Sequence, residues 1–262
     1  MAVTKIDGQT VGYETAGDNG APVLLLHGTT MSHTAFDVVC AAMPADASYQ
    51  YVMMDLPGSV ESSLPDGPLA VETIAAHAHE LMSRLGHERY HVVGFSIGAV
   101  IAAVVAASQP KSVRSATLIA GWITADDRMK ATFELWRRLI TIDPKLFTRY
   151  ALVDGFTAAA HERMAPFFEI AIDIGSATLA PGSEAHLDLD LVVDIESYLD
   201  GIVAPTLIIG GAEDRWVDVV HSHALGQAIK GSRVEVLAAG HMMMAEQAAE
   251  VVALLHPHLS AN

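Results

Sequence analysis

A serine lies between two glycines in the stretch GFSIG, where Ser96 is flanked by Gly94 and Gly98. An apolar, β-branched run precedes it, and an alanine-rich run follows it. A strand that turns sharply into a helix would hold such a serine hydroxyl on an exposed, strained corner, and glycines on both sides would prevent collisions there. The pattern favours a nucleophile, with a plain helix N-cap as the alternative interpretation.

A serine hydroxyl is a poor nucleophile until a base removes its proton, so a histidine and an orienting carboxylate should follow. Asp214 lies in GGAEDRW after one apolar run, and His241 lies in AGHMMM after another. Each run predicts a strand, which places both side chains at the same sheet edge as Ser96. We therefore predict Ser96, Asp214 and His241 as a catalytic triad. Glu213 and Asp126 are the alternatives for the acid.

An acyl-transfer site also needs donors for the negative oxygen of a tetrahedral intermediate. One backbone N–H is expected at Ile97, directly after the serine. The other is expected in the segment HGTT, at Thr29, with Thr30 as the alternative. These two positions form the predicted oxyanion hole.

Large apolar side chains near these positions predict a substrate pocket. Met31, Phe95 and Met242 adjoin the oxyanion segment, the serine and the histidine, and Trp122 and Trp136 belong to a helical block. An apolar lining with few polar groups suits a small or medium hydrophobic substrate. Packing in a helix core is the alternative interpretation for each aromatic residue of that block.

Apolar runs alternate with amphipathic segments over most of the chain, which is typical of a mostly parallel α/β sheet with helices on both faces. Strands are expected at 2–6, 10–15, 22–26, 49–54, 90–95, 113–120, 206–209 and 233–237. Helices are expected at 34–43, 71–85, 97–108, 218–229 and 243–255, and a purely helical block at 126–140, 144–153, 157–174 and 186–198. We predict a core made of residues 1–121 and 201–262, with a helical lid inserted at 122–200.

Composition limits the partners and the compartment. The 262 residues carry 31 acidic and 15 basic side chains, and the net charge of −16 repels phosphate backbones and anionic membranes. Cys40 is the only cysteine, so no intrachain disulfide is expected. No signal-peptide pattern begins the sequence, and the longest apolar stretch is too short to cross a bilayer. We expect a cytoplasmic monomer or homodimer with a small-molecule substrate and no nucleic-acid or membrane partner.

Two further patterns bear on cofactors. Asp188, Asp190 and Asp194 form an acidic stretch, which we interpret as a solvated helix face rather than a metal site. Paired histidines near 221 and 256 lack a third ligand for zinc, and neither G-x-G-x-x-G nor a P-loop occurs. No metal or cofactor is expected.

The motifs VLLLHG, DLPG, GFSIG, APTLIIGGAEDRWV and AGHMMMAEQ, in this order, resemble the α/β-hydrolase superfamily across nearly the whole chain. Within it, the chain is similar to the cap-bearing esterase, enol-lactonase and C–C hydrolase group. The resemblance implies an eight-stranded, mostly parallel sheet and a helical lid, and it maps the predicted triad and oxyanion donors onto the family's own. The sequence departs from the family's pattern after Gly58, where Ser59 stands in place of histidine, and at Ala99, where a glycine is common.

These features predict a serine hydrolase that cleaves a small or medium hydrophobic carboxylic ester or lactone through an acyl-enzyme. Cleavage of a C–C bond, or a lyase or cyclase step with the same triad, is the alternative among enzymes. A ligand receptor that keeps the fold is the alternative outside enzymes. No residue in the sequence separates these chemistries.

Overall fold

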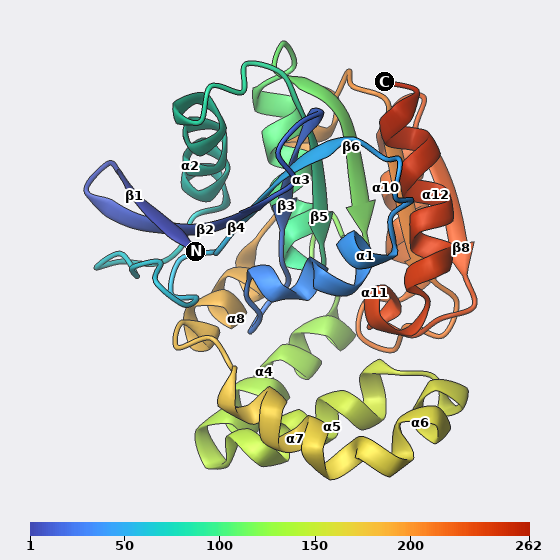
Figure 1. Cartoon of the computed structure of the whole chain (residues 1–262). Coiled ribbons are helices and arrows are strands. Elements are labelled where there is room, and N and C mark those ends of the chain that lie inside the picture. Colours follow the sequence, from blue (N-terminus) through green and yellow to red (C-terminus); the bar gives the residue numbers. More distant parts are fainter.

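The computed structural model describes all 262 residues and is built on one eight-stranded sheet (Figure 1). The strands are β1 (Ala2–Ile6), β2 (Gln9–Ala16), β3 (Ala21–Leu26), β4 (Tyr49–Met54), β5 (Tyr90–Phe95), β6 (Val113–Ile119), β7 (Thr206–Gly211) and β8 (Arg233–Leu237). Their order in the sheet is β1-β2-β4-β3-β5-β6-β7-β8. Strand β2 pairs antiparallel with β1 and β4, and all other pairs are parallel. The predicted α/β fold class is confirmed.

Helices cover both faces of the sheet, because parallel strands need crossover connections. One hydrophobic cluster joins the sheet to α2 (Val71–Arg84), α3 (Ile97–Ser108) and α10 (Val219–Ala228). A second cluster joins the other face to α1 (Asp37–Ala42), α11 (Met243–Glu246) and α12 (Ala248–Ser260). The 3-10 helix η1 (His33–Phe36) leads into α1.

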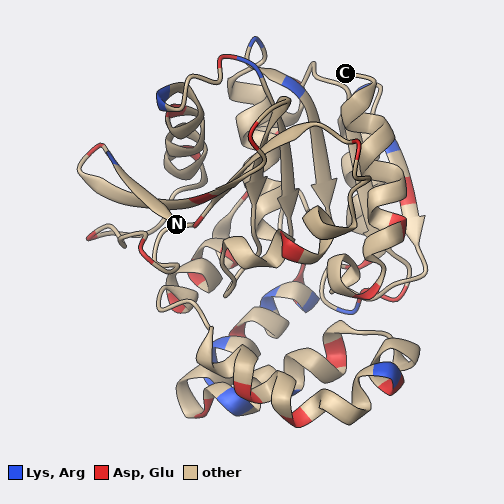
Figure 2. Ribbon diagram, viewed as in Figure 1, with Lys and Arg blue, Asp and Glu red and all other residues tan.

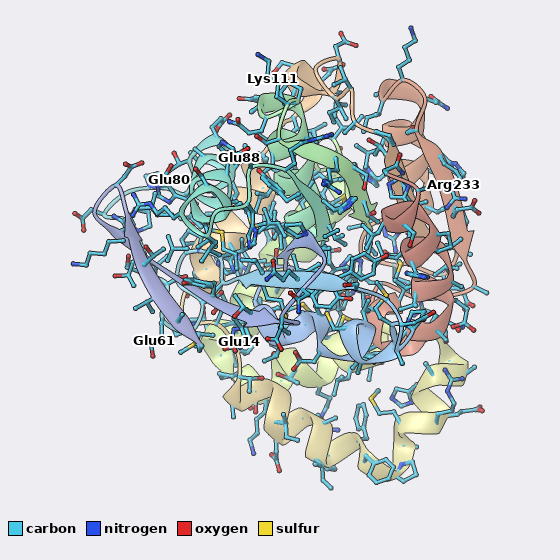
Figure 3. The ribbon with its side chains drawn as sticks, turned by 45° about the horizontal axis from the view of Figure 1, so that its top comes forward. Glu14, Glu61, Glu80, Glu88, Lys111 and Arg233 are labelled. Carbon is cyan, nitrogen blue, oxygen red and sulfur yellow. The ribbon has the colours of Figure 1, made fainter.

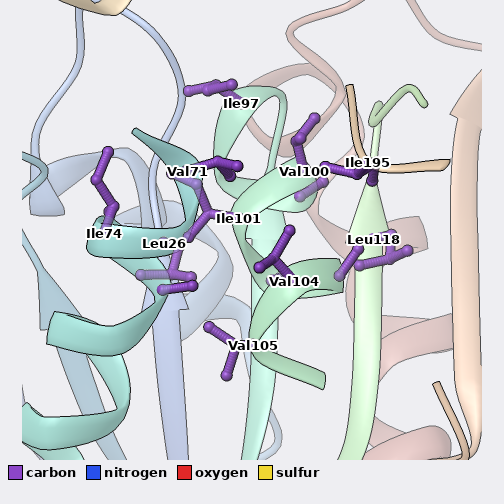
Figure 4. Close-up of a cluster of buried hydrophobic side chains, with 14 of the residues drawn as sticks. Leu26, Val71, Ile74, Ile97, Val100, Ile101, Val104, Val105, Leu118 and Ile195 are labelled. Atoms are coloured by element: carbon purple, nitrogen blue, oxygen red, sulfur yellow. The ribbon is translucent and has the colours of Figure 1, made fainter. Parts of the chain in front are cut away.

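Helix α3 is apolar on all sides and is buried from Ile97 to Ala106, as expected for a helix enclosed between a sheet and other helices. Figure 4 shows Ile101 and Val104 of α3 next to Leu26 of β3 and Leu118 of β6. This packing fixes the N-terminus of α3 against the carboxyl ends of the strands, where GFSIG lies.

An insertion of helices lies between β6 and β7. Its members are α4 (Asp127–Ile142), α5 (Pro144–Gly155), α6 (Ala158–Met164), η2 (Ala165–Phe167), α7 (Phe168–Ala177), α8 (Ser183–Val192) and α9 (Glu196–Leu199). In Figure 1, α4 to α7 form a layer beyond one end of the sheet. This layer, together with α8 and α9, is called the cap below.

Two helix predictions in the cap are wrong in their extent. The predicted helix 157–174 is split into α6 and α7 by η2, which contains Pro166; proline lacks the N–H that a helix interior requires. The predicted helix 186–198 begins earlier, at Ser183, and is interrupted before Glu196 by an extended Val193.

Charged side chains are spread over the exterior, with more acidic than basic positions (Figure 2). The exposed side chains of Glu61 and Lys111 lie near the outline of the molecule in Figure 3. None of the helices combines the length and the apolarity that crossing a bilayer would take.

Candidate active site

Ser96 occupies a strained turn between β5 and α3. Its backbone has φ 56° and ψ −123°, a conformation that residues with side chains rarely adopt and that persists only when the surroundings enforce it. The Ser96 N–H donates to the Ile119 carbonyl at 2.9 Å, which ties the turn to β6. Ser96 stands at the N-cap position of α3, but its hydroxyl makes no capping hydrogen bond, so a capping role does not account for this serine.

The flanking glycines are required by the packing of this turn. A Cβ atom on Gly94 would lie 2.0 Å from the Gly98 carbonyl oxygen, and one on Gly98 would lie 2.0 Å from the Leu26 carbonyl oxygen. Both distances are far inside van der Waals contact with backbone atoms. The strand, the helix and the neighbouring strand can therefore meet at Ser96 only with glycine at both positions.

Asp214 and His241 lie on the loops after β7 and β8 and form a buried pair. His241 Nδ1 lies 2.7 Å from Asp214 Oδ2, while Asp214 Oδ1 accepts the N–H groups of Trp216 and Val217 at 2.9 Å each. Glu213 is exposed, which leaves Asp214 as the carboxylate that holds the ring. Asp126, the other alternative, caps α4 and lies 3.1 Å from His221.

The His241 ring is held between two aromatic side chains. Its centroid lies 5.0 Å from that of Phe95 and 4.9 Å from that of Trp216. Because Nδ1–H donates to Asp214, Nε2 remains an acceptor, and neither Nε2 nor the Ser96 hydroxyl makes a hydrogen bond within the chain. Both residues line the same cavity. Catalytic hydrogen bonds are often long before the substrate binds.

The segment that follows β3 runs close to the serine. A Cβ atom on Gly28 would lie 3.2 Å from the Ser96 Cβ, so only glycine permits this approach. The Thr30 N–H donates to His186 Nδ1 at 3.3 Å, whereas the N–H groups of Thr29 and Ile97 donate to no group of the chain. This difference favours Thr29 over Thr30 as the second donor.

A cavity of about 240 Å³ adjoins Ser96 and His241. Met31, Phe95, Trp136 and Met242 line it, as predicted. The prediction for Trp122 is wrong, because its side chain is fully buried and does not reach the cavity. It packs against Phe133 of α4, with 5.9 Å between ring centroids, and so belongs to the core at the start of the cap.

Further residues line the cavity, and among them only the cap aromatics Phe147 and Phe156 belong to a group for which the sequence left pocket and helix core open. Most come from the cap or from the loop after β7: Phe147, Thr148, Leu152, Phe156, Leu179 and Trp216. Trp216 had a local signal, since it follows Asp214 by two positions. Phe147 and Phe156 had one in their aromatic side chains, and the other cap residues had none. No Lys, Arg, Asp or Glu side chain lines the cavity.

The acidic stretch of the cap is not a uniformly solvated face. Asp188 is exposed and lies 3.0 Å from Arg137, and Asp194 accepts the Glu196 N–H. Asp190, in contrast, is fully buried, and its Oδ2 lies 2.7 Å from the Thr29 hydroxyl. The three carboxylates do not converge, and no cluster of His, Cys, Asp or Glu suited to a metal ion occurs in the structure.

Two buried histidines next to the oxyanion segment are neutral. His27 donates from Nδ1 to the Gly28 carbonyl and accepts the Leu56 N–H at Nε2. His186 of α8 donates from Nε2 to the Pro57 carbonyl at 2.8 Å. Burial lowers the pKa of His27 to about 3 and that of His186 to about 4, because a protonated ring would lose its hydration at these positions.

The other side of the cap is bound to the loops of the acid and the histidine. Asp154 of α5 accepts the Trp216 indole N–H at 3.0 Å, and the Gly155 carbonyl accepts the Met242 N–H at 3.0 Å. Glu246 accepts both the Thr157 hydroxyl and the Gly240 N–H. The cap therefore contacts the loops of the sheet domain on both sides of the cavity.

Comparison with known proteins agrees with this architecture. A model of the alpha/beta hydrolase fold matches residues 21–248. The chain is 28% identical over 266 residues to a pyrrolizixenacetamide deacetylase of Xenorhabdus hominickii, covering 99% of this chain and 98% of the relative. An esterase from Exiguobacterium antarcticum superposes with a TM-score of 0.86 at 21% identity, covering 98% of each chain. The enol-lactonase of Burkholderia xenovorans LB400 superposes with a TM-score of 0.84 at 20% identity, covering 99% of this chain and 100% of that one. With its family model matched over most of its length, the chain belongs to the α/β-hydrolase fold family.

Proposed function

We propose that the protein hydrolyses uncharged carboxylic esters or lactones through an acyl-enzyme on Ser96. The observation that carries this proposal is that His241, paired with Asp214, lines the same cavity as the strained Ser96. His241 Nε2 accepts the Ser96 proton while the oxygen attacks the carbonyl carbon, and Asp214 stabilises the imidazolium that forms. The N–H groups of Thr29 and Ile97 donate to the negative oxygen of the intermediate.

The intermediate collapses when His241 donates its proton to the leaving oxygen, which releases the alcohol and leaves the acyl group on Ser96. Water then loses a proton to His241 and attacks the acyl carbonyl. Breakdown of the second intermediate releases the carboxylic acid and returns the proton to Ser96. In a lactone, the alcohol remains attached to the acyl part throughout.

The cavity supports an uncharged acyl group. Its volume of about 240 Å³ exceeds the roughly 150 Å³ of an engineered cavity that holds benzene. Apart from His241, no basic side chain lines it, so a carboxylate on the substrate would lose its hydration without gaining a counter-charge. A neutral aliphatic or single-ring acyl group fits these properties.

Deacetylation of an amide is a second candidate. Its support is the similarity over nearly the whole chain to the deacetylase of Xenorhabdus hominickii. The same site would serve, with His241 protonating the leaving amine, which departs less readily than an alkoxide without that proton.

Labelling with a fluorophosphonate, followed by intact-mass measurement, tests the nucleophile. We expect one label per chain, lost in Ser96→Ala and retained in Ser32→Ala, a control serine that lines the same cavity. Absence of labelling would contradict an activated Ser96 and favour the ligand receptor.

Turnover of matched substrates tests the class. We expect kcat/KM to be at least about tenfold higher for p-nitrophenyl butyrate than for mono-p-nitrophenyl succinate, because only the latter buries a carboxylate. The ratio of kcat/KM for p-nitrophenyl acetate to that for p-nitroacetanilide shows whether the ester or the amide is the better substrate. Labelling of Ser96 without turnover of any ester, lactone or amide would favour C–C cleavage or a lyase step instead.

A further inference from the structure

Residues 180–190 of the cap contact the segment HGTT (27–30) that follows β3, which is called the oxyanion loop. They bind it at the Thr29 side chain and at the Thr30 backbone. Thr29 Oγ1 lies 2.7 Å from Asp190 Oδ2. The Thr30 N–H donates to His186 Nδ1, and the Thr30 carbonyl accepts the Ala180 N–H at 3.1 Å. Thr30 has φ 67°, a left-handed conformation that is unusual for a β-branched residue. Contacts on both sides of this residue keep the strained turn in place.

Asp190 is enclosed by protein on every side. Its side chain is fully buried, its Oδ1 has no hydrogen-bond partner, and the Thr29 hydroxyl is its one partner. On its own helix, His186 lies one turn earlier and bonds to the Pro57 carbonyl. On α4, which packs against α8, Arg137 pairs with Asp188 at 3.0 Å, and none of the charged groups of α4 forms an ion pair with Asp190. No ion pair therefore reaches Asp190.

Burial leaves this carboxyl group neutral at pH 7. It raises the pKa of Asp190 to about 8, with the Thr29 hydroxyl as a smaller opposing influence. His27, which lies two residues before Thr29 and directly after β3, is also kept neutral by burial. The surroundings of the Thr29 side chain are thus polar but uncharged.

We propose that Asp190 is a positioning residue for the oxyanion hole, acting through the Thr29 hydroxyl to aim the Thr29 N–H at the intermediate. The proposal rests on the proposed function, since an oxyanion forms only if Ser96 attacks a carbonyl. A neutral carboxyl group holds Thr29 without opposing the negative oxygen. An ionised carboxylate at the same place would repel that oxygen across a region that excludes water.

The sign of the pH effect follows from this arrangement. Below about pH 8, Asp190 is protonated and does not repel the negative oxygen in the hole. As the pH rises through that value, the carboxylate forms, the repulsion appears and kcat falls. In Asp190→Asn, the amide keeps a hydrogen bond to Thr29 and has no proton to lose. We expect this variant to retain kcat within about threefold at pH 7 and to lose the alkaline fall.

Truncation tests the contact itself. Asp190→Ala removes the partner of Thr29, and we expect kcat to fall about tenfold with KM changed less than about twofold, because the hole acts in the transition state. Loss of an entire oxyanion donor costs about 10²–10³ in kcat, so misplacement of one donor should cost less. The matched control is Asp188→Asn, an exposed carboxylate on the same helix, which should change neither kcat nor the pH profile.

Measurements are kcat and KM for p-nitrophenyl butyrate from pH 6 to 9.5, the rate of fluorophosphonate labelling, and thermal unfolding of each variant. A fall of kcat at alkaline pH that persists in Asp190→Asn would overturn the role of Asp190. An Asp190→Ala variant in which KM changes and kcat does not would overturn it too. In either case, ester turnover by the wild type would still support the proposed function. If Asp190→Ala does not fold, the pH profile of Asp190→Asn decides. If the wild type neither turns over esters nor labels at Ser96, the proposed function fails, and the role of Asp190 fails with it.

Discussion

The sheet edge and the cap contribute to the site in different ways. Ser96, Asp214 and His241 follow β5, β7 and β8, so the direction of the strands alone brings them to one edge. The Thr29–Asp190 contact instead joins positions 161 residues apart, through side chains only. Secondary structure therefore brings together the three residues that we propose as nucleophile, acid and base, whereas the shape of the loop at Thr29 depends on how the cap packs.

The two sides of the cap also differ from each other. Helix α8 meets the oxyanion loop through buried groups, with His186 and Asp190 both neutral at pH 7. Helix α5 meets the loop of the acid through Asp154, which is partly exposed to solvent. A change of pH should therefore act mainly on the α8 side, whereas removal of the Asp154 carboxylate should disturb the α5 side.

The largest effect should come from the acid at the sheet edge. In Asp214→Asn, the amide oxygen would stay with the N–H groups of Trp216 and Val217, which directs the NH₂ group at His241 Nδ1. The ring then carries its proton on Nε2 and cannot accept one from Ser96. We expect kcat to fall by about 10³–10⁴.

Its control is Glu213→Gln, the same charge change on an exposed neighbour, which should leave kcat within about twofold. Ester turnover is the measurement. Activity in Asp214→Asn close to that of the wild type would contradict the role of the acid.

The next effect concerns the backbone at the sheet edge. Gly98→Ala would place a Cβ atom 2.0 Å from the Leu26 carbonyl oxygen, so α3 and β3 must separate. We expect thermal unfolding to shift downward by an amount equivalent to about 3 kcal/mol or more, with loss of turnover. Gly67→Ala is the control, since nothing lies within 4 Å of its Cβ position. Equal unfolding temperatures for the two variants would show that the turn tolerates a side chain.

The α5 side of the cap should respond less. Asp154→Ala removes the acceptor of the Trp216 indole N–H and the Tyr150 hydroxyl, and Trp216 lines the cavity. We expect a loss of about 1–2 kcal/mol in stability and a raised KM. Asp173→Ala breaks only the exposed ion pair with Lys145, so it should change stability by less than about 1 kcal/mol. A KM unchanged in Asp154→Ala would separate this contact from substrate binding.

A separate effect is a graded loss of stability in acid. The pKa values of His27, His186 and His91 lie below the ordinary value of 6.5 because of burial, so the unfolded chain binds protons that the native state does not. Their contribution is complete above pH 6.5 and is lost as the pH falls from there to the native pKa values, about 4 for His186 and His91 and about 3 for His27. Asp190 acts in the opposite sense between its unfolded pKa near 4 and its native value of about 8, so it offsets one of the three.

Chemical denaturation between pH 4.5 and 7 measures this slope. His186→Gln removes one titrating group and should flatten the slope, whereas the exposed His223→Gln should not. An unchanged slope in His186→Gln would mean that His186 is not held neutral by burial.

Much of the fold, and the placing of Ser96, Asp214 and His241 at one sheet edge, followed from local patterns. The apolar runs predicted the strands to within a few residues, and the glycines on both sides of Ser96 predicted the turn whose contacts require them. The cap was predicted as helical but not in its breaks or its contacts. Trp122 and Asp190 show the reason. A tryptophan can line a pocket or pack in a core, and an aspartate on a helix can face solvent or be buried, and the neighbouring residues in the sequence do not indicate which.

By itself, the sequence determined the alternation of strands and helices, the order of Ser96, Asp214 and His241, and the place of the cap, because hydrophobic period, glycine and turn residues act over short distances along the chain. Only the tertiary structure decided that Asp190 is buried against Thr29 and that Trp122 lies in the core. Whether a side chain loses its water depends on the surface that its helix packs against, and residues far away in the sequence form that surface.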